Sequence, residues 1–252
     1  MSSAAPDAGD EAIVLCGGLG TRLRPVLADR PKALAEVGGR PFLEWLLLAL
    51  AAQGVRRPIL ATGHLAHLVE AGVGDGARLG VRIRYSREAE PLGTAGALRL
   101  AATLTPAPTL AVLNGDTYCR FDLAALRSAH RARAALATLW LEPVEDGGRF
   151  GTVELEADGR ISGFREKAGG GGRPLASAGV YLVERSVVDR VPAGRPASLE
   201  RDVFPALAGR GLFGVRGRGG FVDIGTPESL AGAGQALRQE LGALERETWN
   251  RA

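Results

Sequence analysis

The first half of the chain alternates short apolar runs with segments in which apolar residues recur at helical spacing. Four segments predict strands, at 12–16, 57–62, 81–88 and 109–116, and the last of these is expected to be buried. Helices are expected between and after them, near 41–54, 64–72, 94–103 and 122–133. Strands and helices that alternate in this way are typical of parallel βαβ units, so the pattern predicts an open α/β sheet with helices on both faces.

From residue 135 onward the pattern changes, because strand-like segments follow one another with little helix between them. These segments are ALATLWLE (135–142), GTVELEADGRISGFRE (151–166) and ASAGVYLVE (176–184). The last part of the chain predicts a helix around 200–208, strands near 212–223 and a helix at 227–247. We therefore expect a short disordered tail at 1–10 and one α/β domain at 11–252, with a mixed, mainly parallel sheet and a small antiparallel insertion.

Composition narrows the class of protein. Of 252 residues, 46% are hydrophobic and 23% are charged, which is typical of a globular chain. No apolar run approaches the roughly 18 to 20 residues of a membrane span, and the N-terminal residues do not resemble a signal peptide. We therefore expect a cytoplasmic protein in which Cys16 and Cys119 are reduced thiols. The net charge of +3 comes from scattered arginines, which favours a small anionic substrate over nucleic acid or a membrane. The sequence leaves open whether the protein forms a homo-oligomer.

The segment CGGLGTRLRP, residues 16–25, follows the first predicted strand directly. A dinucleotide-binding turn would carry a third glycine, and a Walker loop would end in Gly-Lys followed by Ser or Thr; both are missing. A purely structural turn leaves unexplained why Arg22, Arg24 and Lys32 gather in the same region. Glycines allow backbone N–H groups to approach an anion, and an arginine adds a bidentate donor. A cradle for the phosphates of a nucleoside triphosphate fits best.

The longer stretch LCGGLGTRLRPVLADRPKALAEVGGRPFLEWLL resembles the signature of the sugar-1-phosphate nucleotidylyltransferases; Cys16 is its one departure, where the family usually has alanine. Further motifs resemble that family in the family's order: EPLGTAGAL (90–98), LNGD (113–116), GFREK (163–167), SAGVYLV (177–183) and FVDIGTPESL (221–230). The resemblance implies a single Rossmann-like (GT-A-like) α/β domain. It also implies attack of a sugar-1-phosphate oxygen on the α-phosphorus of a nucleoside triphosphate, with pyrophosphate as the leaving group.

The resemblance also implies a set of site residues. The catalytic set is Arg22, Lys32, Asp116, Lys167 and Asp223, with a Mg²⁺ ion held by Asp116 and Asp223. The residues expected to bind the nucleotide are Leu15, Gly17, Gly18, Gly20, Thr21, Arg22, Glu88, Gly93, Thr94 and Asp116. Those expected to bind the sugar phosphate are Gly151, Glu166, Lys167, Ser177 and Val180.

Of 31 basic residues only Lys32 and Lys167 are lysines, and both lie inside these motifs. A lysine supplies a compact charge that the wide arginine fork does not reproduce, which favours a functional role for both lysines.

His64 and His67 have a spacing compatible with a metal, but no third ligand is nearby, so a zinc site is disfavoured. His130 is expected to face solvent on its helix.

Glu88 lies five residues before Gly93, and the resemblance implies that a polar residue at this place reads the base. A carboxylate accepts two hydrogen bonds, and guanine offers N1–H and N2–H₂ on one edge, so GTP is favoured over UTP or dTTP. Glu90 is an alternative reader. Among relatives the chain looks most similar to the heptose 1-phosphate guanylyltransferases. Other bases (UTP, dTTP, CTP, ATP), other substrates (mannose, glucose or a cyclitol phosphate) and a non-catalytic nucleotide-sugar-binding protein are the alternatives.

Overall fold

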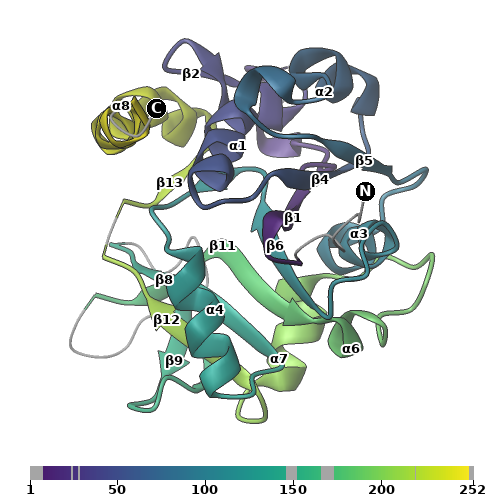
Figure 1. Ribbon diagram of the computed structural model, residues 1–252, viewed down its shortest axis with the longest axis vertical. Helices are drawn as coiled ribbons and strands as arrows, with labels where there is room; N and C mark the ends of the chain where they lie inside the picture. The colour runs from purple at the N-terminus through teal and green to yellow at the C-terminus, as the bar shows by residue number, and fades with distance from the viewer. Residues whose placement is uncertain are drawn as a thin grey trace, which may run out of the picture.

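The computed structural model describes residues 8–23, 25–27, 29–145, 152–165, 173–218 and 220–249. Within these residues the centre of the molecule is a nine-stranded mixed sheet (Figure 1). Its parallel part has the order β6-β1-β4-β5, and the antiparallel order β10-β9-β11 continues it on the β6 side. Strand β8 pairs antiparallel with β11, and β12 pairs parallel with β8. The antiparallel strands of the second half therefore extend the same sheet.

The strands of the main sheet are β1 (Glu11–Leu15), β4 (Arg57–Thr62), β5 (Arg84–Arg87), β6 (Thr109–Asn114), β8 (Ala137–Pro143), β9 (Thr152–Leu155), β10 (Ile161–Arg165), β11 (Leu175–Glu184) and β12 (Leu212–Arg216). Two small sheets pair β2 (Glu36–Val37) with β3 (Arg40–Pro41) and β7 (Thr117–Tyr118) with β13 (Val222–Asp223). The α-helices of the described residues are α1 (Phe42–Ala52), α2 (Ala66–Val73), α3 (Gly93–Ala102), α4 (Leu123–Ala132), α6 (Arg185–Val188), α7 (Phe204–Leu207) and α8 (Pro227–Trp249).

Alternate residues of the central strands face two separate cores. In β1, Val14 belongs to the core beneath α1, α2, α4 and α8, whereas Ile13 belongs to the core beneath α3, α6 and α7. In β6, Leu113 and Val112 divide in the same way. Both faces of these strands are thus buried, which explains why they read as continuous apolar runs. The predicted α/β class, with helices on both faces of the sheet, is confirmed.

The element boundaries differ from the predictions in places. The strands expected near 212–223 are present as β12 and β13, and the structure adds that they belong to different sheets. The predicted helix at 200–208 begins as a π-helical turn, Leu199–Val203, and continues as α7. Part of the predicted tail is ordered: Ala8–Asp10 form a 3-10 turn, and Asp10 makes a two-pronged ion pair with Arg57 at 2.7 and 2.9 Å. Residues 1–7 lie outside the described residues.

The expectation that His130 faces solvent is wrong. Its side chain is buried, with Nδ1 2.8 Å from Thr138 Oγ1 and Nε2 3.0 Å from Glu184 Oε1. The reason is helical spacing, because His130 follows the buried Leu123 and Leu126 at intervals of three and four residues on one face of α4. The two ring nitrogens are satisfied by polar partners inside the protein.

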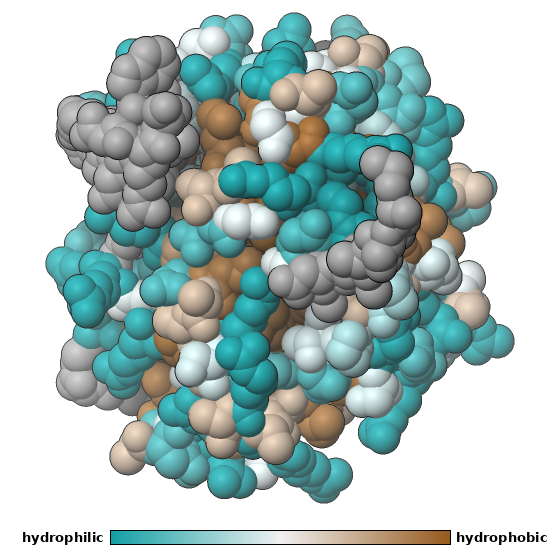
Figure 2. Space-filling model, viewed as in Figure 1, coloured by the Kyte–Doolittle hydropathy of each residue, from teal (hydrophilic) through white to brown (hydrophobic). Residues whose placement is uncertain are grey.

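Polar residues cover most of the face drawn in Figure 2, with apolar residues gathered in narrow areas between them. Within the described residues, no helix is long and apolar enough to cross a membrane. Cys16 and Cys119 are free thiols, as predicted, and the structure shows that both are buried. Burial raises the pKa of the Cys16 thiol to about 12, so this side chain stays neutral and fills the space of a small apolar residue below the glycine loop.

Candidate active site

The glycine loop leaves β1 at the carboxyl end of the parallel strands, the edge where open α/β sheets bind ligands. Among the described residues, no protein acceptor takes the backbone N–H groups of Gly17 to Arg22. Gly20 has a φ of +57°, a left-handed conformation that favours glycine. The loop is therefore a row of available N–H donors of the kind that binds phosphate. It carries the predicted residues Gly17, Gly18, Gly20 and Thr21.

Glu88 lies against this loop from the side of β5. A Cβ placed on Gly17 would come within 2.7 Å of Glu88 Oε1, and one on Gly63 within 2.4 Å, so both glycines make room for the carboxylate. Glu88 Oε2 accepts a hydrogen bond from the Leu92 N–H at 3.1 Å. Burial raises the pKa of the Glu88 carboxyl above its ordinary value. Glu90, the alternative base reader, is exposed.

The second predicted loop forms the start of α3. Gly93 has a φ of +68°, and a Cβ there would lie 2.5 Å from the Ala197 carbonyl oxygen. The Ala95 N–H donates to that same oxygen at 2.9 Å. The Thr94 hydroxyl accepts a hydrogen bond from the Leu199 N–H at 2.8 Å and donates to Glu200 Oε2 at 3.0 Å. The loop is consequently held by the segment 197–200, which the sequence did not single out.

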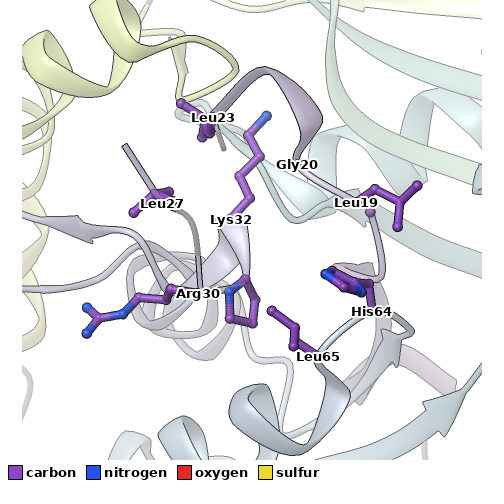
Figure 3. Close-up of a pocket in the computed structure, with 10 residues that line it drawn as sticks. Leu19, Gly20, Leu23, Leu27, Arg30, Lys32, His64 and Leu65 are labelled. Carbon is purple, nitrogen blue, oxygen red and sulfur yellow. The ribbon is translucent and has the colours of Figure 1, made fainter. Parts of the chain in front are cut away.

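Lys32 and Asp116 meet in front of the glycine loop. The Lys32 side chain runs beside Gly20 (Figure 3), and its Nζ donates to Asp116 Oδ2 at 2.8 Å. Lys32 is 14% exposed and Asp116 is 42% exposed. An ion pair this open to solvent contributes roughly 0 to 1 kcal/mol to folding, so its position matters more than its energy. In the same view Arg30 points away from Lys32, whereas His64 lies beside Leu19.

Asp223 is brought to Asp116 by the pairing of two short strands, β7 and β13. β13 lies antiparallel to β7, which places Asp223 opposite Thr117, and the Ile224 N–H donates to the Asp116 carbonyl oxygen at 3.1 Å. A Cβ on Gly225 would lie 2.8 Å from Asp223 Oδ1, so this glycine leaves space for the carboxylate. Two predicted metal ligands, separated by more than one hundred positions, therefore occupy neighbouring places.

The first turn of α8 supports the same carboxylate. The Ser229 hydroxyl lies 3.3 Å from Asp223 Oδ2, and Ser229 and Thr226 exchange hydrogen bonds in the manner of a capping box, with Pro227 at the first helical position. The start of α8 thereby fixes the Asp223 turn.

The donor chemistry of this corner fits a magnesium ion. Mg²⁺ prefers oxygen ligands and typically uses one or two carboxylates together with phosphate oxygens and water. Asp116 and Asp223 supply two carboxylates that meet this requirement. No cluster of three or more His, Cys, Asp or Glu side chains that could hold a metal ion occurs in the described ranges.

The remaining predicted residues divide into three groups. Arg22 is exposed in the 3-10 turn Thr21–Leu23, beside the free N–H donors. Ser177 and Val180 lie on β11 next to the Asp116 turn, but Val180 is buried and pairs with Leu113. Gly151, Glu166 and Lys167 lie outside the described residues.

Sequence reasoning missed three polar residues that lie between the nucleotide loop and the aspartate turn: Asn114, Tyr181 and Glu200. The Asn114 amide donates to the Tyr181 hydroxyl at 3.1 Å, and that hydroxyl lies 3.2 Å from Glu200 Oε1. Asn114 Oδ1 is buried and has no hydrogen-bond partner in the described part of the chain, a state that costs about 1 to 3 kcal/mol. Asn114 stands in the LNGD motif, but Glu200 resembled an ordinary acid in the first turn of a helix.

Comparison with known proteins agrees with this geometry. The sequence model of the family described as nucleotidyl transferase matches residues 11–240, and the chain belongs to this family. The mannose-1-phosphate guanylyltransferase of Mycobacterium tuberculosis is 41% identical over 223 residues, which are 87% of this chain and 62% of that protein. The chain therefore spans less than two thirds of that relative's length.

Two further relatives match along nearly their whole length. The D-glycero-alpha-D-manno-heptose 1-phosphate guanylyltransferase of Aneurinibacillus thermoaerophilus is 34% identical over 229 residues, covering 90% of this chain and 98% of that protein. The crystal structure of HddC from Yersinia pseudotuberculosis has a TM-score of 0.78 at 29% identity and covers 89% of this chain and 98% of HddC. Its complex with GMP-PN has a TM-score of 0.77. These matches confirm the predicted fold and family.

Proposed function

We propose that this chain is a sugar-1-phosphate guanylyltransferase, which joins GTP and a sugar 1-phosphate to give a GDP-sugar and pyrophosphate. The observation that carries the proposal is a convergence at one edge of the sheet. Free backbone donors of the glycine loop, the Lys32 ammonium group and the paired turns of Asp116 and Asp223 all meet there. Cations and carboxylates that hold a cation are what a reaction between two anions requires.

In the proposed reaction a phosphate oxygen of the sugar attacks the α-phosphorus, and the bond to the β-phosphate bridging oxygen breaks. Arg22 and the loop N–H groups bind the outgoing pyrophosphate. The Lys32 ammonium group leaves Asp116 and neutralises negative charge on the α-phosphate. Asp116 and Asp223 would hold one Mg²⁺, which neutralises charge on the phosphate oxygens. Roles for Gly151, Glu166 and Lys167 in holding the sugar phosphate rest on the sequence motifs alone.

Glu88 supports guanine as the base. Its Oε1 is turned toward the glycine loop between Gly17 and Gly63, whereas the exposed Glu90 makes no such approach. A half-buried carboxylate gains most from two N–H donors of a ligand, because these replace the water it has lost. The complex of the HddC relative with GMP-PN is consistent with this assignment.

The sugar is proposed to have the manno configuration. D-glycero-D-manno-heptose 1-phosphate is the leading candidate, because the heptose relative is matched along 98% of its own length. Mannose 1-phosphate is the second candidate, because the Mycobacterium tuberculosis relative is 41% identical. We further propose that the enzyme works in the cytoplasm as one catalytic domain with Mg²⁺, where both phosphorylated substrates are made.

The deciding experiment is pyrophosphate release with five nucleoside triphosphates crossed with heptose, mannose and glucose 1-phosphates, in Mg²⁺ and in EDTA. GTP with one manno-configured sugar phosphate should give the highest kcat/KM, and EDTA should abolish the signal. Release only with UTP or dTTP would overturn the guanine assignment. No release with any pair would overturn the enzyme assignment and favour a nucleotide-sugar-binding protein.

A further inference from the structure

The Glu200 carboxylate accepts hydrogen bonds from three hydroxyl groups, two of which belong to other elements of the fold. Oε2 lies 3.0 Å from Thr94 Oγ1 and 3.1 Å from Ser198 Oγ, and Oε1 lies 3.2 Å from the Tyr181 hydroxyl. Thr94 belongs to the nucleotide loop at the start of α3, and Tyr181 belongs to β11. Glu200 itself stands in the π-helical turn Leu199–Val203, a type of turn that occurs frequently at functional sites.

The direction of two of these hydrogen bonds is fixed by the neighbours. A hydroxyl has one hydrogen to donate. Thr94 Oγ1 already accepts from the Leu199 N–H, and the Tyr181 hydroxyl already accepts from the Asn114 amide, so both hydrogens are directed to Glu200. Burial and the facing Glu200 carboxylate raise the pKa of Tyr181 well above its ordinary value, which keeps the phenol protonated. A carboxylate, which only accepts, is the matching group for three donors.

The network joins the two halves of the proposed site. At one end, Thr94 adjoins Gly93, whose left-handed backbone is closed against Ala197. At the other end, Asn114 is the last residue of β6 and stands two positions before Asp116. The segment before Glu200 is also joined to the nucleotide loop through the backbone, because the Ala197 N–H donates to the Leu92 carbonyl oxygen at 2.9 Å. Among the described residues, Glu200 is thus the side chain that is hydrogen-bonded to both Thr94 and Tyr181.

We propose that Glu200 is a positioning residue that fixes the Gly93–Thr94 loop relative to the Asn114–Asp116 turn. The inference rests on the proposed function, in which the first loop holds the nucleoside and the second holds the metal carboxylate. In-line transfer requires the α-phosphorus to be held close to the attacking oxygen, and a misplacement of about 1 Å can cost about 100-fold in rate. Glu200 acts through Thr94 and Tyr181 and needs no contact with substrate.

The test compares Glu200→Gln with Glu184→Gln. Glu200→Gln keeps the shape of the side chain but turns an amide N–H₂ toward hydroxyl donors. Glu184→Gln changes a carboxylate at the end of β11, which is hydrogen-bonded to Thr109 and His130. Glu200→Gln should lower kcat/KM for GTP by at least about tenfold, with a fall in kcat, and Glu184→Gln should leave both within about twofold. Thr94→Ser should retain activity and Thr94→Val should not. In the double variant, Thr94→Val should add little to the loss caused by Glu200→Gln, because both substitutions break the same Thr94–Glu200 hydrogen bond.

Hydrogen exchange gives a readout that does not depend on activity. In the ligand-free protein, Glu200→Gln should speed exchange of the amides at 94–97 and at 114–117 together, while Glu184→Gln should not. Unchanged exchange at both segments, or unchanged kcat in an active enzyme, would overturn the positioning role. If the wild-type protein releases no pyrophosphate with any substrate pair, the proposed function fails, and linked exchange at the two segments still decides whether Glu200 couples them.

Discussion

The ammonium group of Lys32 lies 2.8 Å from the Asp116 carboxylate, although 84 positions separate the two residues. A cation is thereby held beside one of the two proposed metal ligands, next to the loop that offers free backbone donors. In the proposed reaction, the same ammonium group would move from Asp116 to a phosphate oxygen when the nucleotide binds. The pair therefore gives a testable account of how the site manages charge.

Replacing Lys32 by Met should reduce turnover by about 100-fold, because a positive charge near the reacting phosphate is lost. Binding of Mn²⁺ to the free protein, followed by electron paramagnetic resonance, should become tighter, since Asp116 loses its competing cation. Lys32→Arg keeps the charge but replaces a compact ammonium by a wide fork, so we expect it to remain well below wild type. Full activity in Lys32→Met would remove this residue from the mechanism.

Asp116→Asn and Asp223→Asn should each lower turnover by more than about 100-fold, beyond the 10- to 100-fold effect typical of groups that only orient a metal ligand. Ser229→Ala is the matched comparison, because its hydroxyl touches Asp223 without being a proposed ligand. It should cost about tenfold, and raised Mg²⁺ should restore part of the loss. Pyrophosphate release as a function of Mg²⁺ concentration checks all three, and an Asp223→Asn enzyme with unaltered Mg²⁺ dependence would contradict the metal assignment.

Gly225 and Gly232 offer a matched pair of glycine substitutions. A Cβ at Gly225 would lie 2.8 Å from Asp223 Oδ1, whereas nothing lies within 4 Å of a Cβ at Gly232 in α8. Gly225→Ala should lower kcat about tenfold by displacing the carboxylate, with little change in the free energy of unfolding. Gly232→Ala should leave kcat unchanged and stabilise the helix by roughly 0.5 to 1 kcal/mol. Urea denaturation and steady-state rates measured side by side distinguish the two effects, and equal rates in both variants would count against the Asp223 geometry.

The raised pKa of Glu88 predicts a pH dependence of base selection. Guanine N–H donors need the ionised carboxylate, so the ratio of kcat/KM for GTP over UTP should fall as pH drops through the folded-state pKa. Glu88→Gln should remove this dependence, because an amide does not titrate in this range. A GTP/UTP ratio that does not vary between pH 8 and pH 4, assay limits chosen to extend below the ordinary value of 4.5, would exclude Glu88 as the base reader.

The same shift has a defined sign for stability. A carboxyl group with a raised folded-state pKa favours folding most at pH values below its unfolded pKa, and that contribution is lost as pH rises through the folded-state pKa. Wild-type protein should therefore lose stability relative to Glu88→Gln over this window, above the ordinary value of 4.5. Chemical denaturation of both proteins across this window checks the direction.

Much of the fold could be predicted because its information is local. β1 and β6 face apolar cores on both sides, so their sequences are continuous apolar runs, and the helix patterns beside them depend on residues three or four positions apart. The burial of His130 was predictable in the same way, because its spacing of four residues from Leu126 places it on the buried face of α4. The division of 212–223 between two sheets was not readable, because strand partners are set by the path of the whole chain.

The sequence by itself determined the family and the order of the functional motifs, because glycines, two lysines and two aspartates stand at fixed local spacings. Only the tertiary structure decided which of these groups meet. The β7–β13 pairing sets Asp223 beside the Asp116 turn, and the Glu200 carboxylate joins Thr94 to Tyr181. Glu200 has no local signature, because two of the hydroxyl donors on which its role depends, those of Thr94 and Tyr181, come from other segments of the chain and reach it only in the folded structure.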